Sequence, residues 1–188
     1  MKKSIFAIIC VYLACCSGVL AGNVVTRFAS TAPPAVVTLG HDPAVTPTST
    51  GTSPSSFARF VAPAGGSFTA RSIRAYFTQS GRSWIGGVYA DSAGSPAARI
   101  VVSATGTTVA NVYNCSNLVS PVSIVAETAY FEGWLVDSGL SIGYGYSAGT
   151  NARWTTADTY SALSDPFNGS NTGSPRMLGT YLSSDLCP

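Results

Sequence analysis

Charge is scarce in this sequence, and lysine is almost absent. Charged residues make up 10% of the chain, against about 25% in an average soluble domain. The two lysines, Lys2 and Lys3, lie at the very start, so residues 22–188 contain eight arginines, eight acidic residues and no lysine. The resulting formal charge of zero lacks the overall positive excess that is typical of nucleic-acid-binding proteins. We therefore predict no nucleic-acid partner and a surface made mainly of uncharged polar residues.

Histidine is also scarce, which limits catalysis. The single histidine, His41, lies in a stretch rich in Pro, Thr and Ser, so a Ser-His-Asp arrangement would have to recruit a flexible segment. Glu132 and Asp137 lie five residues apart on a predicted strand. Their side chains would therefore point to opposite faces about 17 Å apart, whereas a glycosidase needs two carboxylates about 5 to 9 Å apart. We predict that the protein is not an enzyme and holds no cofactor.

Metal ligands are few for the same reason. One histidine and two cysteines beyond residue 21 fall short of the usual zinc ligand set. A structural calcium ion at Asp91, Asp137 or Asp158 is an alternative, because calcium binds carboxylates and backbone carbonyls. An aspartate at a strand end also accepts hydrogen bonds from its own turn. We expect this second role and predict no metal site.

No apolar run is long enough to span a bilayer. The candidate run, residues 5–14, follows two lysines and precedes Val19-Leu20-Ala21, as in a secretory signal peptide. We expect residues 1–21 to be this signal; the alternative is a lipid on Cys16, which follows Leu13-Ala14-Cys15 as in a lipoprotein box. Either way we predict a secreted or cell-surface protein, periplasmic or extracellular, that is not integral to the membrane.

Only two cysteines, Cys115 and Cys187, lie beyond this segment. Two thiols in an exported chain most simply form one disulfide bond. The alternative is two free thiols that lie too far apart to pair. A disulfide would tie the last residues of the chain to the middle of the fold.

Helical periodicity is missing as well, since no 3.6-residue period persists for three turns. At most a turn of helix is expected near residues 157–163. Residues 22–56 are rich in Pro, Thr and Ser and predict an extended arm or linker, with an isolated strand at 23–28.

In residues 57–188, short apolar-polar alternations separated by turn residues predict one all-β domain. We expect a two-sheet antiparallel β-sandwich, jelly-roll-like, with an immunoglobulin-like sandwich as the alternative. The predicted strands are 57–61, 71–78, 83–91, 98–104, 107–113, 122–126, 129–137, 140–147, 152–156 and 176–183.

Four runs in this domain carry a family resemblance. They are ARFVAPAGGSFTARSIRAYF, IGGVYADSAGSPAARIV, SPVSIVAETAYFEGWLVDSG and YGYSAGTNARW. These runs resemble the jelly-roll modules of secreted bacterial proteins, which look like carbohydrate-binding modules in fold and often have no assigned function. The resemblance covers roughly residues 57–183. It implies recognition or attachment outside the cell and supplies no catalytic residues.

Residues 130–149 contain closely spaced aromatic side chains that strand alternation sorts into faces. Tyr130, Trp134 and Val136 share one face with Glu132, and Phe131 and Leu135 share the other. On the next strand Leu140, Ile142, Tyr144 and Tyr146 point together, opposite glycines and serines. The aliphatic side chains are expected in the core, and the two tyrosines lie where the core ends.

Flat aromatic faces with polar neighbours suit sugar rings. We therefore predict a glycan site at this end of the strand; the alternative is that the aromatic residues only fill the sandwich. The candidate ligand-binding residues are Tyr144, Tyr146, Asn151, Arg153, Trp154, Asp158 and Tyr160.

Two functions remain after these exclusions. The first is a non-catalytic recognition, attachment or adhesion module whose partner is a glycan or another cell-surface or extracellular matrix component. The second is a structural subunit of an extracellular filament or matrix. In that case the N-terminal arm would complete the sheet of a neighbouring copy, and the absence of net charge leaves self-association open.

Overall fold

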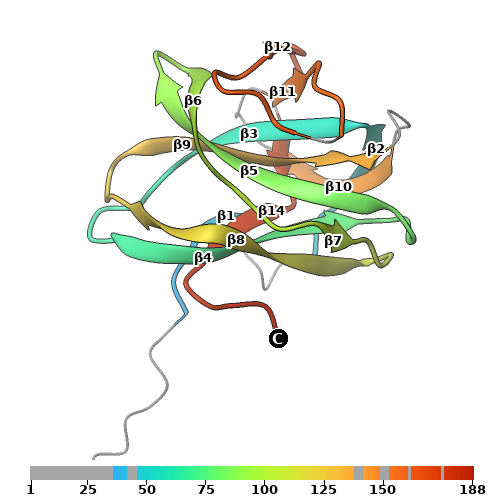
Figure 1. Ribbon diagram of the computed structural model, residues 1–188, viewed down its shortest axis with the longest axis horizontal. Helices are drawn as coiled ribbons and strands as arrows, with labels where there is room; N and C mark the ends of the chain where they lie inside the picture. Colours follow the sequence, from blue (N-terminus) through green and yellow to red (C-terminus); the bar gives the residue numbers. More distant parts are fainter. Residues whose placement is uncertain (1–35, 42–45, 138–141, 149–152, 161, 175) are drawn as a thin grey trace, which may run out of the picture. The chain divides into compact units, whose positions relative to one another are not determined.

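Short alternations of apolar and polar residues, broken by turns that contain glycine and proline, form strands throughout the chain (Figure 1). The computed structural model describes residues 36–41, 46–137, 142–148, 153–160, 162–174 and 176–188. The named elements in this part of the chain are all strands, and residues 157–160, 162 and 163, where at most a turn of helix was expected, belong to neither a strand nor a helix. The all-β prediction is confirmed. The expected signal peptide and the predicted strand at 23–28 lie outside the described residues.

One sheet, sheet A, contains seven antiparallel strands. Its main path runs β1-β14-β4-β10-β13, with β2 paired to β10 and β8 paired to β4. The strands are β1 (Thr38–Gly40), β2 (Ser49–Ser53), β4 (Phe68–Phe77), β8 (Val112–Ile124), β10 (Ile142–Ala148), β13 (Arg176–Leu178) and β14 (Thr180–Ser183).

The second sheet, sheet B, also has seven antiparallel strands, along the path β12-β11-β3-β9-β5-β6, with β7 paired to β5. The strands are β3 (Ser55–Val61), β5 (Ser83–Ser92), β6 (Ser95–Val102), β7 (Gly106–Thr107), β9 (Ala129–Val136), β11 (Arg153–Thr156) and β12 (Gly169–Asn171).

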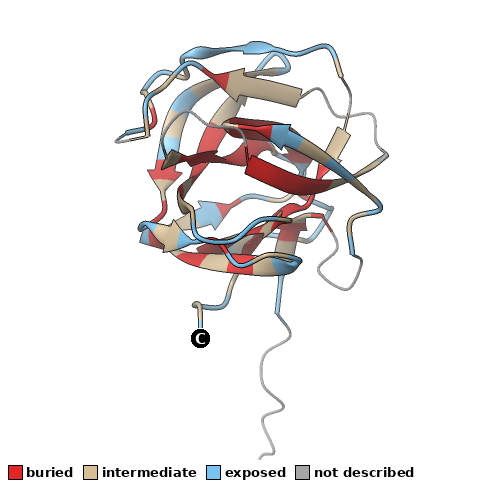
Figure 2. Cartoon of the chain, turned by 90° about the vertical axis from the view of Figure 1, so that its right-hand side faces the viewer, coloured by how far each residue is buried: buried red, intermediate tan, exposed pale blue. Residues whose placement is uncertain are grey.

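The two sheets form the layers of a sandwich, as predicted. In Figure 1, β4 and β8 lie below β3, β5 and β9. Successive strands cross from one sheet to the other at most steps from β2 to β11, as in Greek-key sandwiches. Figure 2 shows the buried residues concentrated on the strands and the exposed residues mainly in the connecting turns.

The central core lies between the sheets and is rich in aromatic side chains. Phe77 packs edge-on against Trp84 and Trp134, with ring centroids 5.4 and 5.2 Å apart. Ile73 and Ile142 are fully buried in the same cluster. Inward-facing side chains on sheet A therefore meet inward-facing side chains on sheet B, which is how a sandwich buries its apolar area.

A second core covers the outer face of sheet B. Phe57, Tyr89, Phe131 and Leu135 point away from the central core and are buried together with Leu163. Strand β9 thus has a buried side chain on each face at almost every position. The predicted alternation is confirmed: Tyr130, Trp134 and Val136 belong to the central core, and Phe131 and Leu135 to the second.

The chain around Leu163 and Phe167 forms this cover. Leu163 sits directly over Gly87, where a Cβ atom would come within 2.5 Å of its Cδ1 atom. The hydroxyl of Tyr89 donates a hydrogen bond to the carbonyl of Ser164 at 3.0 Å, and the N–H of Phe167 donates to the carbonyl of Ala97 at 2.9 Å. Apolar packing and main-chain hydrogen bonds together hold this segment on the sheet.

The sandwich begins earlier than predicted. Strands β1 and β2 lie within residues 22–56, where an arm was expected, and each pairs with a strand of sheet A. Leu39 is buried in the central core. These strands are short and carry Thr, Ser and Gly, so their composition resembles that of a linker although their backbones complete the sheet.

Strand β8 continues through Pro121, where the sequence predicted a break. Proline has no N–H to donate, so it is tolerated at edges and bulges. The pairing of β8 with β4 shifts register between Ala70 and Ser72, opposite the segment that contains Pro121. The bulge therefore accommodates the proline within one long strand.

The predicted disulfide bond joins Cys115 on β8 to Cys187, across 72 residues of sequence. The neighbouring tail is also hydrogen-bonded to sheet A: the Ser72 hydroxyl donates to the carbonyl of Asp185 at 2.6 Å, and the N–H of Cys187 donates to the side-chain oxygen of Asn117 at 2.8 Å. The C-terminal residues are thereby fixed to the sheet.

Replacing Cys187 with Ser should lower the free energy of unfolding of residues 22–188 by about 4 kcal/mol, because a loop of this length loses much of its unfolded-state entropy when it is closed. Urea unfolding followed by tryptophan fluorescence measures this change. Reduced wild-type protein should unfold at the midpoint of the variant. A variant as stable as oxidised wild type would contradict a structural role for the bond.

Candidate functional site

Three of the predicted ligand-binding residues come together at one edge of the sandwich. Strand β13 ends the path of sheet A, and β11 is next to last in sheet B. Between them lies a group that we call the edge cluster. It consists of Ser56, Tyr144, Tyr146, Arg153 and Arg176.

The two tyrosines of the edge cluster mark the end of the central core. Tyr144 is 0% exposed, and its ring packs against that of Trp134 at 5.2 Å between centroids. Tyr146, two residues further along β10, is half-buried, with its ring 6.0 Å from that of Tyr144. The aromatic stripe therefore ends at the edge, as the alternation predicted, but only Tyr146 is near enough to solvent to meet a ligand.

Both arginines of the cluster are anchored by neutral groups. Arg153 donates from Nε to the hydroxyl of Ser56 at 2.7 Å, and its guanidinium carbon lies 5.5 Å from the centre of the Tyr144 ring. Arg176 donates to the Tyr144 hydroxyl at 2.9 Å and lies 4.1 Å from the centre of the Tyr146 ring. Gly51 on β2 leaves room for this contact, because a Cβ atom there would lie 2.9 Å from a nitrogen of Arg176.

Neither of these arginines forms an ion pair with a carboxylate of the described residues. The ion pair seen among those residues joins Arg59 and Asp91. Burial lowers the pKa of the Arg153 guanidinium; Tyr144 and, less strongly, Tyr146 oppose this shift, whereas the positive charge of Arg176 adds to it. Among the described residues, the edge cluster is thus a half-buried pair of arginines without a carboxylate partner.

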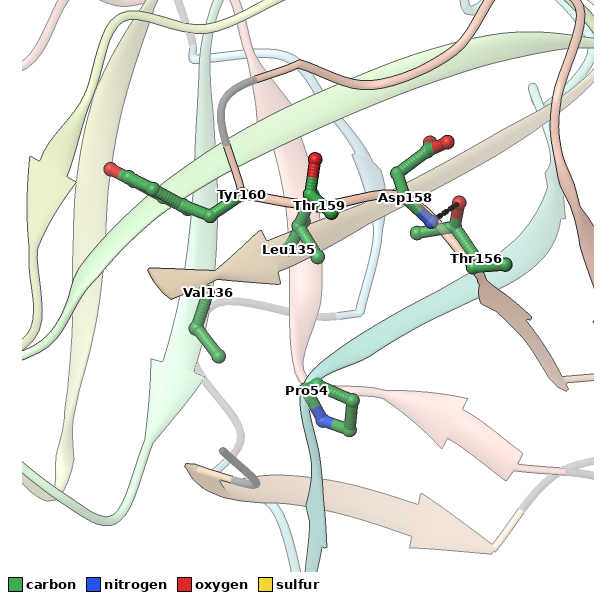
Figure 3. A pocket seen from close by; sticks show the side chains of 8 residues that line it. Pro54, Leu135, Val136, Thr156, Asp158, Thr159 and Tyr160 are labelled. Carbon is green, nitrogen blue, oxygen red and sulfur yellow. Dashed lines mark hydrogen bonds between the residues drawn. The ribbon is translucent and has the colours of Figure 1, made fainter. Parts of the chain in front are cut away.

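A pocket of about 490 Å³ lies at the other end of β11 (Figure 3). Pro54, Leu135 and Val136 supply apolar walls, and the chain from Thr156 to Tyr160 supplies hydroxyl groups and one carboxylate. Two predicted residues, Asp158 and Tyr160, line this pocket. The hydroxyl of Tyr160 is buried and has no hydrogen-bond partner among the described residues.

Asp158 mainly organises its own loop. Its carboxylate accepts hydrogen bonds from both the N–H and the hydroxyl of Ser164. The other two calcium candidates are also engaged, since Asp91 pairs with Arg59 and Asp137 accepts from the N–H of Ser83 at 3.2 Å. Within the described ranges no group of three His, Cys, Asp or Glu residues is placed to hold a metal ion.

Trp154, another predicted ligand-binding residue, packs against the second core. Its ring packs edge-on against Phe131 and Phe167, with centroids 6.1 and 6.3 Å apart. The indole N–H is buried without a partner among the described residues. Trp154 is half-buried and packs β11 against the second core. Asn151, the remaining predicted residue, lies outside the described residues.

His41 is part of the folded sandwich, not of a flexible arm. It is 2% exposed, and both ring nitrogens are hydrogen-bonded, Nε2 with the Ser147 hydroxyl at 3.0 Å and Nδ1 with the Tyr113 hydroxyl at 2.8 Å. The main-chain N–H of His41 donates to the carbonyl of Thr180 at 2.8 Å. A histidine held in this way is a structural link between β10 and β8.

Glu132 is the most unusual titratable group of the central core. It is 0% exposed, and neither carboxyl oxygen makes a hydrogen bond of ordinary geometry with the described residues. Burial raises the pKa of this carboxyl well above its usual range, and the backbone of Leu182 partly opposes the shift. The protonated form therefore predominates in the folded chain over a pH range in which an exposed glutamate is charged.

This shift predicts a pH-dependent stability. Between the ordinary carboxyl pKa of about 4.3 and the raised folded value, the folded chain holds a proton that the unfolded chain has lost. The free energy of unfolding should therefore fall as the pH rises through this window, by at most about 1.4 kcal/mol per pH unit. In Glu132→Gln the fall should disappear. Urea unfolding between pH 4 and 8 measures the slopes.

The exposed Glu127 provides the control for this experiment. Glu127→Gln should keep the wild-type slope, since its side chain is in water in both states. If wild type and Glu132→Gln showed the same slope, the carboxyl of Glu132 would not be protonated in the folded protein.

Sequence reasoning missed Arg176 and Ser56. Arg176 lies 23 residues after Arg153, and Ser56 lies 97 residues before it, so no local spacing connects them. The pairing of β10 with β13 and of β11 with β3 brings them together. The sequence offered only one indirect signal. Residues 22–188 contain as many arginines as acidic residues, so the sequence does not assign each arginine an acidic partner.

No known family model matches this chain, and no curated protein is significantly similar to it. A sandwich fold hosts many functions, so the fold by itself assigns none. The features of this chain that bear on function are the edge cluster and the pocket at the two ends of β11.

Proposed function

We propose that the protein is an exported, non-catalytic recognition module that binds glycan along β11. The observation that carries this proposal is the position of two complementary features at the ends of one short strand. The hydroxyl-lined pocket begins at Thr156, and the edge cluster begins at Arg153. At about 3.3 Å per residue, these positions are about 10 Å apart.

The pocket has the chemistry that a sugar ring requires. Saccharides present apolar C–H faces and hydroxyl groups, and binding pockets generally combine apolar walls with a few directed polar groups. Leu135 and Val136 provide the first, and the exposed Thr159 and the half-buried Asp158 provide the second. Figure 3 shows Thr159 and Tyr160 projecting to different sides of the loop, so their hydroxyls are separated in space.

Export is supported by one feature of the fold and by one of the sequence. The disulfide bond between Cys115 and Cys187 is of a kind that persists in oxidising compartments. The start of the sequence has the pattern of a signal peptide. In the described residues, no helix is long and apolar enough to cross a membrane.

Screening residues 22–188 on a glycan array, after size-exclusion chromatography, tests the proposal. Binding to at least one glycan is expected, and Tyr146→Ala should weaken it about tenfold or more, because Tyr146 is the half-buried aromatic residue at the edge. Affinity is then measured by calorimetry. Tyr146→Ala should retain cooperative thermal unfolding.

Tyr76 provides a matched control, since it is also half-buried but lies on β4, where it packs against Tyr113. Tyr76→Ala should leave the affinity unchanged. Loss of binding in Tyr76→Ala but not in Tyr146→Ala would place the site elsewhere. A protein that binds no glycan and elutes as a large assembly would favour the structural-subunit alternative.

A further inference from the structure

The edge cluster differs from the pocket in that it contains two positively charged groups close together. Two guanidinium groups approach the same tyrosine, one through a hydrogen bond to its hydroxyl and the other over its ring. Like charges repel, and partial burial increases that repulsion because less water screens it. The arrangement is expected to be more favourable when an anion bridges both groups.

The donors of these arginines are still largely unused. Each guanidinium has five N–H donors in one plane, whereas Arg153 and Arg176 each make one side-chain hydrogen bond within the described chain. Their other guanidinium nitrogens are not among the buried, partnerless polar atoms of the described residues. Both arginines are half-buried, so part of each side chain is in contact with solvent.

Stacking fixes the orientation of one guanidinium without using its donors. Arg176 lies 4.1 Å from the centre of the Tyr146 ring, and a guanidinium that rests on an aromatic face keeps its in-plane N–H groups available. Arg153 is held at Nε by Ser56, a fully buried residue of β3. Both groups are thus positioned before a ligand binds, which lowers the entropy cost of binding.

A planar or tetrahedral oxyanion fits these donors best. Carboxylate and sulfate oxygens accept pairs of parallel N–H bonds from arginine. The chain as a whole has no net positive charge beyond residue 21, so any preference for anions has to come from a local site. The edge cluster is such a site, and it adjoins the strand that leads to the pocket.

We propose that the glycan bound along β11 is acidic, and that Arg153 and Arg176 together bind an oxyanion on its sugar ring. This inference rests on the proposed function and specifies its ligand class. The oxyanion is the carboxylate of a uronic acid or the sulfate ester of a sulfated sugar, since the two share this chemistry. Arg153 and Arg176 are binding residues here, whereas Ser56 is a positioning residue.

Calorimetry with matched saccharides tests the inference. The probes are tetragalacturonate, its fully methyl-esterified form, a sulfated galactan tetramer and the unsulfated tetramer. At least one acidic probe should bind ten or more times as tightly as its neutral counterpart. The methyl ester keeps the sugar and removes only the charge, so it isolates the contribution of the oxyanion.

Three single variants locate the contact. Arg153→Gln and Arg176→Gln should each lower the affinity for the preferred acidic probe about tenfold or more. Arg71→Gln removes the same charge from an exposed position on β4 and should leave the affinity unchanged. If either edge variant fails to fold, NMR of the Nε–Hε groups of wild-type protein replaces it: the resonances of Arg153 and Arg176 should shift on addition of the acidic probe.

Each remaining outcome is decisive. A preference for the sulfated probe identifies sulfate as the source of the oxyanion, and a preference for tetragalacturonate identifies carboxylate. Equal binding of charged and neutral probes would overturn the inference and leave the proposed function standing. Binding of polyglutamate as tightly as the acidic saccharides would overturn it as well, since a sugar would not be required. Failure of every saccharide to bind would overturn the proposed function with it.

Discussion

The burial of β9 on both of its faces is the constraint on which the rest of the structure depends. Its inward side chains complete the central core, while Phe131 and Leu135 on the opposite face require a cover of their own. The chain that carries Leu163 and Phe167 supplies this cover. Without this cover the side chains of Phe131 and Leu135 would be exposed to water, at a cost of about 1.5 to 3 kcal/mol for each one.

The cover also fixes the position of the candidate site. Strand β11 is held against β3 by Trp154 on one face and by hydrogen bonds between Thr156 and Ser55 along its edge. This placement directs Arg153 toward Tyr144 and leaves the pocket open after Thr156. The same segment therefore buries the outer face of the sheet and positions both parts of the candidate site. The packing of the second core and the geometry of the candidate site are therefore coupled.

The sequence allowed good predictions wherever the alternation of apolar and polar residues along a strand, or the number of cysteines, determined the answer. The two faces of β9, the inward direction of Tyr144 and the pairing of Cys115 with Cys187 followed from period-two patterns and from the count of cysteines. Strands β1 and β2 were missed because their small polar residues resemble a linker. The roles of Trp154 and Arg176 depend on strand pairings between residues distant in sequence, which a single sequence does not reveal. The same holds for His41, whose partners lie on two other strands.

Amide hydrogen exchange measures directly whether the second core holds β11 in place. If it does, the amides of β11 should exchange within about tenfold of those of β9, and Leu163→Ala should speed exchange in β11 while leaving β4 protected. Leu163 is 1% exposed and contacts no residue of the edge cluster through a hydrogen bond. Rapid, unprotected exchange of β11 in wild-type protein, with β9 still protected, would contradict the dependence of the site on this core.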